Sequence, residues 1–246
     1  KDSKKRWFPY NKGGSFRKWF GNQQFLVDWE NDGQRIKKAA EGASGGRIVS
    51  IDNYFHQSLS WSKVTSGGFA IRFFQAGFIF DVAGTSLFSN TEQTLYLMAM
   101  LNSNLNQPFI KSLSPTLNFE AGQIGNMPVI FPKQESTKQT IDTLTQECID
   151  ISKEEWDSRE TSWDFTKNEL LKHLVPKGTL CEKSDSKIET AYNNYCQVWR
   201  EKFYKLHANE EELNRLFIDI YELGDELTPD VDLKDITILK SESIIN

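Results

Sequence analysis

The spacing of hydrophobic and polar residues changes near residue 134. Before that point, short apolar runs alternate with polar residues at the spacing of half-buried strands. Bounded by glycines and other turn residues, these runs predict strands at 25–29, 59–64, 69–73 and 78–82. The glycine-containing breaks between the last three runs suggest a meander. A short closing strand is predicted at 124–130.

Helical spacing dominates the second half of the chain. One helix is already predicted from about residue 90 to 105, with Asn90 as its N-cap and Gln93 placed to complete a capping box. Four further helices are predicted at 136–156, 163–174, 186–206 and 209–224. The sequence therefore predicts an α+β protein, with a strand-rich domain of residues 1–133 followed by a helical region of residues 134–246.

The two regions carry opposite charge. Residues 1–133 hold 15 basic and 9 acidic residues, whereas residues 134–246 hold 14 and 25. The overall charge of -5 would argue against nucleic-acid binding, but ten basic residues lie between Lys1 and Lys38. This asymmetry is typical of a basic face on one half and a solvated acidic face on the other. A frayed basic end is the alternative explanation.

Several classes of protein are excluded by composition. No apolar run approaches the roughly 18 residues of a transmembrane helix, so no membrane contact is expected. The first residues lack the apolar region of a signal peptide. The three cysteines form no CxxC pair, which argues against a zinc ribbon, a thioredoxin-like site and a disulfide scaffold. These features are typical of a protein of the reducing cytoplasm.

The chain contains no recognisable catalytic motif. The glycine pairs at 13–14 and 45–46 lack the GxG core of a cofactor-binding loop. Asn106–Phe109 comes within one residue of the Asn/Asp-Pro-Pro-aromatic loop of amino-methyltransferases, but we interpret it as a loop that ends a helix. The letters of a PD-(D/E)xK nuclease at 229–234 lie too close together for two strands. We therefore predict no catalytic residue, metal site or cofactor in this chain.

The strongest candidate for function is the basic, aromatic first half. Residues 10–22 interleave cations, amides, aromatics and glycines, a pattern suited to phosphates and bases. Arginine on a strand could also form a fork to guanine. DNA contact is predicted for Lys12, Arg17, Lys18, Ser62, Lys63 and Arg72, with Trp19 and Trp61 as packing or stacking supports. The alternative is an ordinary αβ domain whose aromatics fill its core.

A series of short segments also carries a family resemblance. The segments run in order over nearly the whole chain, at 8–14, 17–22, 27–33, 61–63, 77–84, 101–103, 114–122, 124–129, 156–165 and 225–231. They resemble the C-terminal part of the adenine-specific methyltransferases of BREX phage-defence systems and of related type IIG restriction-modification enzymes.

The resemblance implies that the chain is a fragment. In that family the glycine-rich cofactor loop and the catalytic Asn-Pro-Pro-Tyr loop lie in an N-terminal domain, and neither occurs here. The remainder is similar to the target recognition domains of type I specificity subunits, in which a curved mixed β-sheet places loops on the DNA major groove and a helical region follows.

The implied function is a DNA specificity module that reads base pairs around the target adenine. The missing domain of the same parent chain would transfer a methyl group from S-adenosylmethionine to adenine N6 and so mark bacterial DNA as self. The implied partners are double-stranded DNA, that methyltransferase domain and, as further candidates, other phage-defence proteins. The implied location is the bacterial cytoplasm.

Two alternatives stay open at this point. The acidic helical half, with faces such as 210–212, could be a scaffold that docks other defence proteins without reading DNA. A metal-dependent nuclease would instead use Asp230, Asp232 and Lys234. Charge reversal of the predicted DNA contacts separates the first alternative from the specificity module, and Asp232→Ala tests the second.

Overall fold

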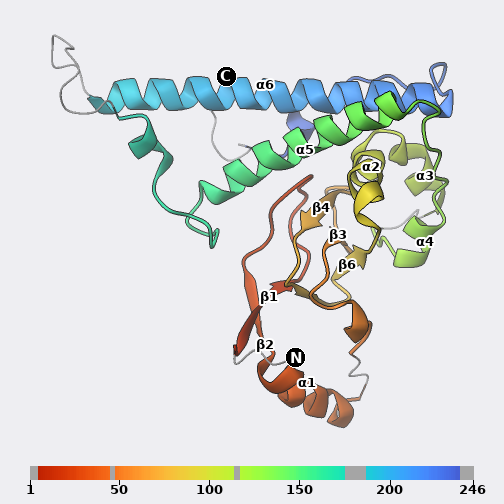
Figure 1. Ribbon diagram of the computed structural model, residues 1–246, viewed down its shortest axis with the longest axis vertical. Coiled ribbons are helices and arrows are strands. Elements are labelled where there is room, and N and C mark those ends of the chain that lie inside the picture. Colours follow the sequence, from red (N-terminus) through yellow and green to blue (C-terminus); the bar gives the residue numbers. More distant parts are fainter. Residues whose placement is uncertain (1–4, 45–47, 114–116, 175–186, 239–246) are drawn as a thin grey trace.

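The computed structural model describes residues 5–44, 48–113, 117–174 and 187–238, and it is a mixed α+β fold as predicted. Two long helices, α5 and α6, lie side by side at one end of the molecule (Figure 1). The strands and the small helix α1 extend away from them, toward the opposite end. The predicted polar loop at 177–185 lies outside the described residues.

The first sheet has the order β2-β1-β5. Its strands are β1 (Trp7–Asn11), β2 (Phe25–Asp28) and β5 (Ile79–Phe80). Strand β1 was not predicted, and it pairs antiparallel with β2 and parallel with β5. The meander prediction was wrong for β5, because the chain turns at Gly77 (φ 110°) and crosses to β1.

A small separate core supports this sheet. Trp29, Tyr54 and Ile79 are buried together, and the rings of Trp29 and Tyr54 meet edge to face at 5.3 Å. Helix α1 (Glu30–Gly42) follows β2 closely, and its start is kinked by three consecutive left-handed residues at 31–33. The predicted turn at these residues is therefore present, although the helix beyond it was not predicted.

The second sheet has the order β4-β3-β6 and is antiparallel throughout. Its strands are β3 (Ser58–Ser62), β4 (Ile71–Phe74) and β6 (Gly84–Leu87). Strand β6 was not predicted. The alternation along β3 predicted a half-buried strand, but all five of its residues are buried, as in a central strand covered on both faces.

Three shorter helices follow the sheets. Helix α2 (Thr91–Asn102) begins after Asn90 as predicted, but without the capping box, because no side-chain hydrogen bond caps it. Helix α3 (Asn106–Leu113) begins at the segment interpreted as a helix-terminating loop, so that interpretation was wrong. Helix α4 (Ala121–Gly125) replaces the predicted closing strand, because Glu120 and Gln123 form a capping box at its start.

The two long helices dominate the second half. Helix α5 (Glu135–Asp157) was predicted closely, and α6 (Lys187–Tyr221) is one helix where two were predicted. Asn209, where the second helix was predicted to begin, lies inside α6, and its side chain donates to the Glu147 carboxylate of α5 at 2.9 Å. Short 3₁₀ turns lie at Ile51–Asn53, Glu169–Lys172 (η2) and Leu233–Asp235.

The segment 163–174, predicted as a helix, contains only the 3₁₀ turn η2. The exposed Trp163 stacks on Phe78 instead of following a helical stripe. Within the described residues, no helix combines the length and apolar character needed to cross a membrane.

The main hydrophobic core joins the strands to the helices. Leu59 of β3 and Ile71 of β4 are fully buried in the same cluster as Met98 of α2, Cys148 of α5 and Phe217 of α6. Helix α2 packs against both β4 and α5, so it lies between the second sheet and the long helices. The position of the second sheet is therefore set by the helices, and the boundary at residue 133 stays a prediction.

Candidate nucleic-acid interface

Three of the residues predicted to contact DNA meet at one surface hollow. Lys12 follows β1 of the first sheet, whereas Ser62 and Lys63 lie at the end of β3 in the second sheet. The hollow has a volume of about 370 Å³ and is lined by Lys12, Gly14, Ser62, Lys63, Val64, Asp81, Val82 and Ala83. We call it the lysine hollow.

The floor of the lysine hollow is fixed by short hydrogen bonds. The Ser62 hydroxyl accepts from the Gly14 amide at 3.0 Å and donates to the Gly14 carbonyl at 2.8 Å. The Lys63 amide donates to the Ala83 carbonyl at 3.0 Å. Gly13 has a left-handed backbone (φ 71°), and a Cβ there would lie 2.7 Å from the Ala83 oxygen. The glycines therefore permit a close approach of the two sheets.

The charges around the lysine hollow are of both signs. Lys12 is exposed, and no carboxylate in the described part of the chain forms an ion pair with it. Lys63 Nζ lies 2.9 Å from the Glu120 carboxylate, in a partly exposed pair. Asp81 accepts from the Tyr10 hydroxyl at 2.6 Å and from the Ala83 amide at 2.8 Å. Burial and the hydrogen bond to Asp81 raise the pKa of Tyr10.

Arg72 lies on the inner side of Ser62 and is 1% exposed. Its guanidinium donates to the Arg17 carbonyl at 3.2 Å and to the Ser62 hydroxyl at 3.1 Å. Burial, together with the neighbouring charge of Arg17, lowers the pKa of Arg72 to about 10. Among the described residues no carboxylate pairs with Arg72. In this conformation the guanidinium reaches no solvent and presents no fork to a base.

The three predicted residues at 17–19 hold the strands against the long helices. Arg17 donates to the Phe20 carbonyl at 2.6 Å and to the Glu155 carboxylate of α5. Lys18 Nζ lies 2.6 Å, and Trp19 Nε1 2.7 Å, from the Glu210 carboxylate of α6. Because all of these side chains except Lys18 are nearly fully buried, the segment is anchored within the protein.

Trp61 is a packing residue in this structure. It is 2% exposed, its indole N–H donates to the Phe119 carbonyl at 2.8 Å, and its ring packs against Phe69. The structure thus brings Lys12 and Lys63 together at the surface above the buried Ser62, and it places Arg17, Trp19, Trp61 and Arg72 inside. DNA contact stays a prediction for all eight residues.

Sequence reasoning missed the acidic partners of the basic residues. Glu155 and Glu210 lie 138 and 191 positions from Arg17 and Trp19, respectively. Each has other acidic residues close by in the sequence, such as Glu154 beside Glu155 and Glu211 beside Glu210, so no local pattern distinguishes it. Asp81 could have been noticed from the sequence, because it precedes a turn that ends at Gly84. Its carboxylate accepts a hydrogen bond from the Gly84 amide at 3.2 Å.

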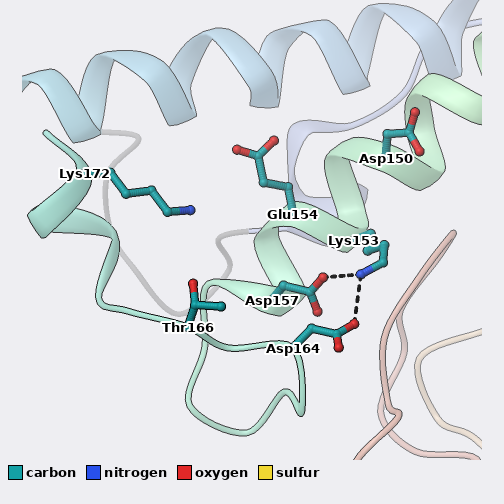
Figure 2. A pocket seen from close by; sticks show the side chains of 7 residues that line it. All are labelled: Asp150, Lys153, Glu154, Asp157, Asp164, Thr166 and Lys172. Carbon is teal, nitrogen blue, oxygen red and sulfur yellow. Dashed lines mark hydrogen bonds and ion pairs between the residues drawn. The ribbon is translucent and has the colours of Figure 1, made fainter.

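A second hollow, beside α5 and η2, is acidic. Its lining residues are Asp150, Lys153, Glu154, Asp157, Asp164, Thr166 and Lys172 (Figure 2). Lys153 bridges Asp157 and Asp164, and Glu154 pairs with Lys202 of α6. These carboxylates are therefore largely neutralised by neighbouring lysines, and no group of His, Cys, Asp and Glu suited to a metal occurs in the described residues.

The nuclease alternative gains no geometry from the structure. Asp230 and Asp232 lie in an irregular segment and Lys234 in a 3₁₀ turn, rather than on two adjacent strands. Lys234 pairs with Asp232 itself at 2.5 Å, and both side chains are mostly exposed.

No protein-family model matches the chain. It is similar to a part of two curated proteins. It is 40% identical over 243 residues to an adenine-specific methyltransferase, PglX, of Lacticaseibacillus casei, which is 96% of this chain and 19% of that protein. It is 32% identical over 232 residues to an adenine-specific methyltransferase, BrxX, of Escherichia coli, which is 93% of this chain and 17% of that protein. The chain thus spans less than a fifth of the length of either relative.

Proposed function

We propose that this chain is the DNA specificity module of an adenine-specific DNA methyltransferase in phage defence, of the BREX or restriction-modification type. It would read the base pairs around the target adenine, while catalysis and S-adenosylmethionine binding would lie elsewhere in the longer protein. The similarity to two named adenine-specific methyltransferases, over nearly all of this chain but less than a fifth of theirs, supports this division of labour.

The observation that carries DNA contact is the lysine hollow. Lys12 and Lys63 come from different sheets, yet their side chains line the same surface depression. Two lysines on a rigid, glycine-lined floor are suited to a polyanion, because positive charge near the surface attracts phosphates and glycine allows a close approach. The proposed partners are double-stranded DNA and the methyltransferase domain of the same longer protein.

The long helices would hold the DNA-reading part in register with that catalytic domain. Buried ion pairs from residues 17–19 to Glu155 and Glu210 support such rigid coupling. A methyl group can be delivered to one chosen adenine only if the reading surface keeps a fixed position relative to the catalytic pocket. This role does not require any catalytic residue in the chain.

An exchange of recognition segments tests the proposal. Residues 1–133 would be transplanted between two full-length relatives that methylate different sequences, and N6-methyladenine would be mapped in genomic DNA by long-read sequencing. Both parents must keep the acidic partners at 155 and 210, so that the transplanted segment stays anchored. We expect the methylated sequence to follow the transplanted segment.

A folded, active chimera that keeps the recipient's sequence would contradict the proposal and favour a scaffold. Reversal of Arg72 to glutamate is unsuitable for this purpose, because Arg72 is buried and the variant would lose its fold. Lys12→Glu with Lys63→Glu is the better charge reversal, since both side chains reach the surface. It should abolish DNA methylation in the folded protein.

A further inference from the structure

We propose that the lysine hollow binds one phosphate group of the DNA backbone and does not read a base. The inference rests on the proposed function, because it says which part of the DNA this site would hold. It is carried by the geometry of the hollow, by the buried cation behind it and by the state of its hydrogen-bonding groups.

The fixed polar groups of the hollow are already paired with one another. The Ser62 hydroxyl is engaged by Gly14, and the Lys63 amide is engaged by Ala83. Reading a base edge requires fixed donors and acceptors that are free to face the base, usually a guanidinium fork or a planar amide. The hollow offers instead two flexible ammonium groups, which act as point charges and suit phosphate oxygens.

Arg72 adds positive charge behind the floor. It is fully buried, donates to the Ser62 hydroxyl at 3.1 Å and has no carboxylate partner among the described residues. Charges in a low-dielectric interior act more strongly than charges in water. The buried guanidinium therefore makes the potential at the floor more favourable to an anion, although it does not touch the ligand.

The two acidic side chains near the hollow do not prevent a phosphate from binding there. Both carboxylate oxygens of Asp81 already accept hydrogen bonds, one from the Tyr10 hydroxyl and the other from the amides of Ala83 and Gly84. Glu120 pairs with Lys63 at the surface, where the Glu120 side chain is 52% exposed. Ion pairs that are this exposed contribute little to stability. A phosphate can therefore take the place of Glu120 beside Lys63.

The walls of the hollow fit the sugar that accompanies a phosphate. Val64 and Val82 are 64% and 55% exposed, respectively, and both line the hollow. Exposed apolar side chains beside two lysines can pack on a deoxyribose while the lysines hold the phosphate. Contacts of this kind fix the position of a protein on DNA and carry no sequence information.

The test compares neutral variants of the full-length protein that carries this chain. Lys12→Gln and Lys63→Gln would be titrated with duplexes of several unrelated sequences, by fluorescence anisotropy over a range of KCl concentrations. We expect each variant to lose roughly three- to tenfold in affinity for every duplex and about one unit of salt slope. Glu120→Gln should increase affinity, because it removes the competing carboxylate.

Lys133→Gln is the matched control. Lys133 is also an exposed lysine, but it lines a different hollow beside the end of α6. It should leave both affinity and salt slope unchanged. Methylation mapping of Lys12→Gln and Lys63→Gln should return the wild-type sequence at reduced occupancy.

The outcomes separate the two proposals. Unchanged affinity and salt slope in both lysine variants would overturn the phosphate site, as would a methylated sequence that changes in either variant. In the second case the hollow reads bases and the proposed function stands. A uniform loss of affinity in a protein whose methylation has no sequence preference would support the phosphate site and overturn the specificity role. A wild-type protein that binds no duplex would overturn both.

Discussion

Arg17, in the loop after β1, donates a hydrogen bond to the Glu155 carboxylate of α5, and both side chains are nearly fully buried. The pair joins the strand-rich and helical parts of the molecule across 138 positions of sequence. Part of the charge asymmetry between the two halves is therefore used inside the protein. Arg17 also lies over the Trp156 ring, 5.2 Å from its centroid, so it is packed as well as paired.

Arg17→Met should lower the free energy of unfolding by about 3–5 kcal/mol, because it leaves the buried Glu155 with Arg159 as its remaining cationic partner. Urea denaturation measures the change. Arg35→Met is the control, since the Arg35 side chain is 71% exposed in its pair with Asp28. A loss no larger than that of the control would show that the buried pair contributes nothing.

Glu210→Ala should destabilise the protein by about 2–4 kcal/mol, because Lys18 and the Trp19 indole both lose their acceptor. Glu210→Gln should cost less, since its amide oxygen can still accept from the indole. Both variants would be compared by chemical denaturation. If the alanine variant keeps the wild-type midpoint, the network does not hold the segment 17–19 to α6.

Gly13→Ala should destabilise the protein by about 1–3 kcal/mol. The residue is left-handed, and the new methyl group would lie 2.7 Å from a backbone oxygen, which cannot move away easily. Gly42→Ala is the matched control, because nothing lies within 4 Å of a Cβ there and its φ is not positive. Thermal unfolding of the two variants would distinguish a specific constraint from a general effect of alanine.

Tyr10 should ionise at higher pH than an ordinary tyrosine, because burial and Asp81 favour its neutral form. A raised folded pKa means that the stabilisation is complete below the unfolded pKa of 10.0 and is lost as pH rises above it. Tyr10→Phe should cost about 1 kcal/mol at neutral pH and progressively less above pH ~10. Denaturation curves across this range test the sign; a cost that grows with pH would contradict it.

Cys148 should resist alkylation in the folded protein, because burial raises the pKa of its thiol and excludes the reagent. Cys196 on α6 is only half-buried and should react faster than Cys148. Peptide mass spectrometry after iodoacetamide treatment measures both. Labelling of Cys148 at a rate similar to that of Cys196 under native conditions would contradict the packing of α5 against the core.

Much of the local structure could be predicted from the chain alone. The α5 stripe, the strands around 25–28 and 58–62 and the α+β class follow from spacing, because an amphipathic element carries its own period. The helix at Asn106 was missed because its first residues were interpreted as a loop that ends a helix, and the short helix α4 was missed because residues 124–130 were interpreted as a closing strand. Strand β1 was missed because it contains a proline and lies in a polar, aromatic segment.

The sequence by itself determined the class of elements, the uneven charge and the absence of a recognisable catalytic motif. Tertiary structure decided which basic residues are buried and which reach the surface. Arg17 and Lys63 look alike along the chain, but one faces a buried carboxylate and the other reaches the surface. The reason is that local spacing fixes the period of an element, whereas pairing across 138 or more positions depends on how the elements pack.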